Sequence, residues 1–165
     1  MRFADCPTTE TEVFIAAPPE QVWPLVTEIT TPTKFGTELQ EASWVDEGDA
    51  PRLGARFTGR NFHPARGEWE TMSTIVDFEP ARRFGWAVGD PDAPSAVWRL
   101  ELAPEGSGTR LRYRAQMGPG PSGMTVIIEK MPDKEEKIIG RRLEEWQANM
   151  AATINGIKEM AEGKA

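Results

Sequence analysis

Apolar side chains recur at spacings of three and four between residues 133 and 162, which is the period of one face of an α-helix. The members of this face are Ile139, Leu143, Trp146, Met150, Ile154, Ile157 and Ala161. Charged and amide side chains, including Arg142 and Glu145, fall between them and are expected to face water. Asp133 fits an N-cap and Gly163 fits a helix stop. The pattern predicts one long amphipathic helix that needs a broad apolar surface to cover it.

The middle of the chain, from Gln40 to Met117, changes to short segments with a period of two. Segments rich in Gly, Pro and Asp interrupt it at 48–51, 63–67, 79–80, 89–94 and 104–108. These breakers predict an antiparallel meander of five short strands. In the later strands one face is apolar: Phe84, Trp86, Val88, Ala96, Trp98, Leu100, Leu102, Leu111, Tyr113, Ala115 and Met117. The other face is charged, as expected of a sheet with one side in water.

The strand expected over 68–78 does not alternate cleanly. Trp69 and Ile75 fall on one parity, whereas Val76 and Phe78 fall on the other. A β-bulge would reconcile the two halves, so a bulge is expected here and the facing of the strand stays open.

The segments that flank the meander complete the order of elements. A strand is expected over 11–17 and two short helices over 20–29 and 33–39, and a further helical segment over 124–131 leads into the long helix. This order indicates an α+β fold with helices on one face of an antiparallel sheet. Residues 1–165 contain no repeat or linker and are interpreted as a single domain, with disorder left open for about the first ten residues.

Composition removes several classes of function. A net charge of −7 argues against nucleic acid and anionic membrane surfaces as partners. No apolar run approaches the roughly 18 residues of a membrane span, and the N-terminus lacks the apolar core of a signal peptide, so a soluble cytoplasmic protein is expected. One cysteine and one histidine cannot form a disulfide or the usual zinc set, so no metal and no cofactor are predicted. The identity of any protein partner stays open.

Three stretches resemble a known superfamily. They are Val13-Phe14-Ile15-Ala16-Ala17-Pro18-Pro19-Glu20-Gln21-Val22-Trp23, Phe78-Glu79-Pro80-Ala81-Arg82-Arg83-Phe84-Gly85-Trp86 and Gly108-Thr109-Arg110-Leu111, followed by the terminal helix. Together they resemble the START/polyketide-cyclase superfamily (SRPBCC), whose founding shape is the major birch-pollen allergen. The resemblance implies a helix-grip fold, in which a curved seven-stranded antiparallel sheet wraps around the long C-terminal helix and leaves an apolar cavity. Members of the superfamily bind lipids, sterols and polyketides, and a subset are aromatase/cyclases.

The residues expected to line such a cavity come from both layers of the fold. They are Phe35, Phe57, Asn61, Trp86, Trp98, Tyr113, Met117, Trp146 and Met150. Flat aromatic rings suit a hydrophobic or ring-containing ligand, but the same rings could equally interdigitate as plain core. Pocket lining and solid core both remain open from the sequence.

Two residues are candidates for chemistry. His63 could act as a general acid or base, or could simply be a turn residue before Pro64. Asn61 could point its amide into the cavity or could cap a turn. No close set of nucleophile, base and orienting group is visible. The favoured function is therefore binding or transport of a small hydrophobic molecule. The alternatives are a polyketide cyclase or dehydratase and a protein-interaction module with a filled core.

Overall fold

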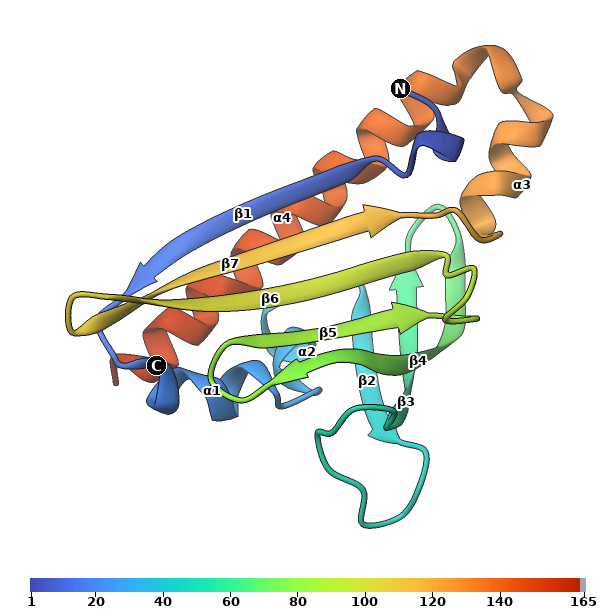
Figure 1. Ribbon diagram of the computed structural model, residues 1–165. Coiled ribbons are helices and arrows are strands. Elements are labelled where there is room, and N and C mark those ends of the chain that lie inside the picture. Colours follow the sequence, from blue (N-terminus) through green and yellow to red (C-terminus); the bar gives the residue numbers. More distant parts are fainter. Residues whose placement is uncertain (164–165) are drawn as a thin grey trace.

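The computed structural model describes residues 1–163, in which seven strands form one curved antiparallel sheet beside a long helix (Figure 1). The strands are β1 (Thr8–Ile15), β2 (Leu39–Trp44), β3 (Arg56–His63), β4 (Gly67–Glu79), β5 (Arg83–Val88), β6 (Ala96–Glu105) and β7 (Gly108–Met117). The helices are α1 (Pro19–Val26), α2 (Thr31–Phe35), α3 (Gly123–Lys130) and α4 (Glu135–Ala161), with 3₁₀ turns at Phe3–Asp5 and Pro132–Lys134. Among these residues, no helix is both long enough and apolar enough to cross a membrane.

The strand order is β1-β7-β6-β5-β4-β3-β2, so the first strand joins the last and β2 to β7 form a meander. Six strands follow α2, one more than the five counted from the sequence. In Figure 1, α4 runs diagonally across one face of the sheet, with α3 near its start and α1 near its end. The predicted α+β helix-grip fold, with a curved seven-stranded sheet and two short helices after the first strand, is confirmed.

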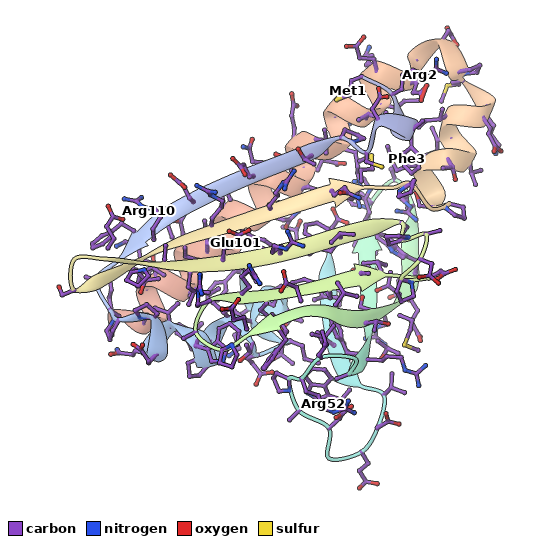
Figure 2. The ribbon with its side chains drawn as sticks, in the orientation of Figure 1. Met1, Arg2, Phe3, Arg52, Glu101 and Arg110 are labelled. Atoms are coloured by element: carbon purple, nitrogen blue, oxygen red, sulfur yellow. The ribbon has the colours of Figure 1, made fainter. Side chains whose placement is uncertain are left out.

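The two faces of the sheet differ as the alternation predicted. Leu100, Leu102 and Leu111 are buried toward α4. Figure 2 shows Glu101 and Arg110 on the side turned away from α4, where Arg110 pairs with Glu105 at 2.8 Å. The apolar face is therefore the one that α4 covers.

Strand β4 contains the expected bulge. Its register with β5 shifts between Ile75 and Asp77, so Val76 is the extra residue. Ile75 is 1% exposed whereas Val76 is 39% exposed, which assigns the facing that the sequence left open. The bulge lets both halves of the strand present apolar side chains to the interior.

Helix α4 buries the predicted apolar face, with Leu143 half-buried at its margin. One charged residue departs from the prediction: Arg142 is only 8% exposed and does not face water. The predicted N-cap is also wrong. Asp133 lies in the preceding 3₁₀ turn, and α4 begins at Glu135 without a side-chain cap. The stop is as expected, because Gly163 has a φ of +75° and its N–H bonds the carbonyl of Met160.

The remaining segments fall close to their expected positions. Helix α2 is shorter than expected and ends at Phe35. The first ten residues, for which disorder was left open, are tied to the domain. The Phe3 ring is buried, and the backbone N–H of Phe3 donates to the Glu135 carboxylate at 3.0 Å. Strand β1 pairs with β7 from Thr8 onward.

Candidate ligand-binding cavity

A cavity of about 350 Å³ lies between the apolar face of the sheet and α4. Eight of the nine side chains selected from the sequence line it: Phe57, Asn61, Trp86, Trp98, Tyr113, Met117, Trp146 and Met150. Two exposed residues, Glu28 and Arg66, also line it, so the cavity reaches the surface. Its volume lies in the range of about 300–1,000 Å³ that is usual for small-molecule sites.

Aromatic rings form one continuous wall of the cavity. The centroids of Trp98 and Trp146 are 4.7 Å apart, and those of Trp98 and Tyr113 are 5.9 Å apart. The wall continues from Tyr113 to Trp86 at 6.4 Å and from Trp86 to Phe57 at 6.0 Å. Because Trp86 and Trp98 remain only half-buried on the covered face of the sheet, the rings leave space between the layers instead of filling it.

The ninth selected residue, Phe35, is not among the lining residues. Its ring lies flat over Gly156 of α4, where a Cβ atom would come within 2.5 Å of three ring carbons. The sequence could indicate an apolar role for Phe35, but not that a glycine on α4 accommodates it. Phe35 therefore fastens α2 to α4.

The polar end of the cavity is built around Arg142 of α4. Its guanidinium donates two hydrogen bonds to the carboxylate of Glu38, at 2.6 and 2.7 Å, in a bidentate pair. The two side chains are only 10% and 17% exposed. Burial alone would lower the pKa of Arg142, but the hydrogen bonds and charge of Glu38 outweigh it and raise that pKa. A permanent ion pair therefore closes this end of the apolar wall.

Asn149, two turns after Arg142 on α4, makes a second attachment to the segment that follows α2. Its Oδ1 accepts the backbone N–H of Thr37 at 2.6 Å and the Thr37 hydroxyl at 3.2 Å. The Asn149 Nδ2 donates to the carbonyl of Glu145, which fixes the orientation of the amide. Residues 35–38 are thus held to α4 by an aromatic contact, an amide and an ion pair.

His63 belongs to the same polar network but does not line the cavity. Its Nε2 lies 2.7 Å from Oε2 of Glu145, and its Nδ1 accepts the backbone N–H of Ala65 at 3.0 Å. In its neutral form the ring therefore carries its proton on Nε2, and this N–H donates a hydrogen bond to the Glu145 carboxylate. Burial would raise the pKa of Glu145, but hydrogen bonds from His63 and Arg142 outweigh it and lower that pKa. Both ring nitrogens of His63 are occupied within the protein.

Arg66, in the turn between β3 and β4, supplies a second positive charge to the lining. Its guanidinium carbon lies 4.0 Å from the centroid of the Trp69 ring, a cation–π contact. Partial burial and the nearby charge of Arg142 lower the pKa of Arg66, and Glu38 offsets part of that effect. The guanidinium also touches Gly123 at the start of α3, where a Cβ atom would come within 2.5 Å of it.

Asn61 points its amide into the cavity, one of the two roles that the sequence left open. Its Nδ2 lies 3.4 Å from the carbonyl of Gly59 and 3.3 Å from the hydroxyl of Thr71. Both Thr71 and Asn61 line the cavity. Polar side chains of β3 and β4 therefore join the lining on the same face as Phe57, next to the aromatic wall.

Tyr113 stands in the middle of the aromatic wall, on β7. It is 4% exposed, and burial raises the pKa of its phenol far above its usual range. The hydroxyl consequently stays protonated throughout the pH range in which the protein would operate.

The sequence did not indicate Arg142, Glu38, Arg66 or Asn149 as site residues. Arg142 and Glu38 lie 104 positions apart, and nothing local to either residue indicates the other.

Within residues 1–163, no group of three or more His, Cys, Asp and Glu side chains is placed to hold a metal ion.

Fold and cavity together define a helix-grip protein with an internal apolar site. The profile of the family described as "Polyketide cyclase / dehydrase and lipid transport" matches residues 7–150, and the chain belongs to this family, within the SRPBCC superfamily of hydrophobic-ligand-binding proteins. No curated protein sequence matches the chain significantly.

Solved structures agree with this assignment. A Polyketide_cyc-like protein from Corynebacterium glutamicum is 35% identical, with a TM-score of 0.64 over 94% of this chain and 91% of its own. Two more distant structures share the fold. The Zhui aromatase/cyclase from Streptomyces sp. R1128 is 17% identical, with a TM-score of 0.63 over 94% of this chain and 93% of its own. The di-domain ARO/CYC StfQ of the steffimycin biosynthetic pathway is 16% identical, with a TM-score of 0.70 over 95% of this chain and 51% of its own.

Proposed function

We propose that this chain binds a small, largely apolar, ring-containing molecule in the cavity between the sheet and α4, and stores or carries it. The observation that carries the proposal is the open space of about 350 Å³ behind a wall of five aromatic side chains, Phe57, Trp86, Trp98, Tyr113 and Trp146. Apolar ligands gain most from such a site because they leave water entirely and stack on flat rings. A filled core, as an interaction module would have, does not fit a void of this size.

The polar end supports a binding role through orientation. Arg142 is already neutralised by Glu38, while Arg66 and Asn61 present donors to the lining. A few fixed polar groups in an otherwise apolar site set which end of a ligand enters first. The ligand would therefore lie with its more polar end toward Arg66 and its rings against the tryptophans.

The alternative, a polyketide cyclase or dehydratase, is supported by the family and by the aromatase/cyclases that share the fold. It would need a group that moves protons on the ligand. His63, the residue first considered for that role, faces Glu145 and Ala65, and it does not line the cavity. This arrangement favours a carrier over an enzyme that uses His63 as its base.

Native mass spectrometry of the purified protein, followed by a thermal-shift screen of fatty acids, sterols and aromatic polyketides, tests the proposal. Retention of a small molecule, or a rise in Tm with one class of compound, is the expected result. Trp98→Leu should weaken uptake of the responding compound by about tenfold or more, since it removes a ring from the wall. Trp44→Leu is the matched control, because Trp44 packs on Phe57 but does not line the cavity.

Two results would contradict the carrier. Failure of every compound to bind, by mass spectrometry and by thermal shift, would leave the protein-interaction alternative. Turnover of a bound polyketide that is lost in Asn61→Ala or His63→Ala, while binding is unchanged, would establish the enzyme instead.

A further inference from the structure

The hydroxyl of Tyr113 is a polar group in the most apolar part of the cavity. Its ring lies between those of Trp86 and Trp98, at 6.4 and 5.9 Å, and its cross-strand neighbours are Leu100 on β6 and Thr11 on β1. Within residues 1–163 the hydroxyl makes no hydrogen bond to the protein, although the residue is only 4% exposed. It is also not among the fully enclosed polar atoms that lack a partner, so it opens onto the cavity.

Water in the open cavity can bond to this hydroxyl, but an apolar ligand that displaces the water would leave the hydroxyl without a partner, which is costly. A phenylalanine would fill the same position in the wall with the same ring and without that cost. The hydroxyl is therefore best explained by a partner that enters the cavity.

We propose that the ligand carries a neutral carbonyl oxygen part-way along its ring system, and that the Tyr113 hydroxyl donates a hydrogen bond to this oxygen. The inference rests on the proposed binding function and names the class of ligand within it. It divides ring-bearing ketones and quinones, which offer such an oxygen, from hydrocarbons and simple lipids, which do not.

The surroundings of Tyr113 select a neutral acceptor. Burial keeps its phenol protonated, so it is always able to donate. The rings in contact with Tyr113 are those of Trp86 and Trp98, and its cross-strand neighbours are Leu100 and Thr11. None of these side chains brings a positive charge, so an anionic oxygen would lose its hydration there without a counter-ion. The positive groups, Arg66 and Arg142, belong to the polar end instead.

Fluorene and 9-fluorenone give a direct test, because they share one tricyclic shape and differ by a single carbonyl group. Tryptophan fluorescence quenching measures the Kd of each compound. The wild type should bind fluorenone about five- to tenfold more tightly than fluorene, the usual effect of one hydrogen bond. Tyr113→Phe should remove most of that preference while leaving the Kd for fluorene unchanged.

Two controls separate a hydrogen bond from a change of shape. Met117→Leu alters the lining without removing a polar group, and should change the Kd of both compounds by the same factor. Tyr113 is the only tyrosine of the chain, so protein labelled with ¹³C at the tyrosine Cζ gives one NMR signal from the phenol. That signal should shift on addition of fluorenone and move much less with fluorene.

The outcomes distinguish this inference from the function on which it rests. If both compounds bind equally to wild type and to Tyr113→Phe, the carbonyl inference is wrong while the binding function stands. If neither compound binds, by quenching or by NMR, the proposal that the cavity takes ring-containing molecules is contradicted as well.

Discussion

Replacing Arg142 by methionine tests whether the ion pair at the polar end of the cavity holds the fold together. Methionine keeps an apolar stem over Trp146, 5.8 Å from the guanidinium in the native protein, but removes the charge and both hydrogen bonds to Glu38. Breaking a fully buried pair costs about 3–5 kcal/mol, and the residual exposure of 10% and 17% lowers this to about 2–3 kcal/mol. For a chain of this length, that corresponds to a fall in Tm of about 5–10 °C.

Urea unfolding at pH 7, followed by tryptophan fluorescence and circular dichroism, gives the free energy of unfolding. Arg110→Met is the matched control, because Arg110 makes the same two-bond contact with Glu105 on the exposed face of the sheet. Its unfolding midpoint should hardly change. In the double variant Arg142→Met, Glu38→Gln, the loss should be smaller than the sum of the single losses by at least about 1 kcal/mol. Equal losses for Arg142→Met and Arg110→Met would refute the reasoning.

Two further predictions concern the same helix. Gly156→Ala should lower the free energy of unfolding by about 1 kcal/mol or more, since the new methyl group would displace the Phe35 ring. Gly140→Ala should raise the free energy of unfolding by about 0.5–1 kcal/mol, because the nearest atom to its new methyl group is 3.9 Å away. Urea titrations that show the same sign for both variants would contradict this reasoning. Glu145 has a pKa below its ordinary 4.5 in the folded protein, so its contribution is present above about pH 4.5 and is lost as the pH falls through the lower folded value. Urea midpoints measured across this range should therefore fall less steeply for Glu145→Gln, and an unchanged slope would show that the contacts of Glu145 with His63 and Arg142 do not stabilise the fold.

The sequence predicted those features that depend on local periodicity. The apolar face of α4 and the inward rows of β6 and β7 follow from spacings of three to four and of two, and the mixed parity around Val76 was enough to expect a bulge. Eight lining residues were found by combining such rows with the cavity that the family resemblance implies, although Leu102 and Leu111 on the same rows belong to the core and do not line the cavity.

The polar end could not be found by the same reasoning. Arg142 occupies the margin of the helical face, where a charge normally reaches water, and only the distant Glu38 makes its burial tolerable. His63 was judged without an orienting partner because Glu145 is 82 positions away. Phe35 was expected in the cavity but packs on Gly156 of α4. The ring fits there because Gly156 has no side chain, and a glycine carries no apolar signal that a sequence pattern can show.

The three attachments of residues 35–38 to α4 have a consequence for the route by which a guest molecule exchanges. Their partners on α4, Arg142, Asn149 and Gly156, follow one another at intervals of seven residues, or two helical turns, so all three lie on the same side of the helix. These three contacts keep residues 35–38 against α4 while the domain remains folded. Ligand exchange is expected beside these contacts, where the beginning of α3 meets the β3–β4 turn through the long, flexible side chain of Arg66.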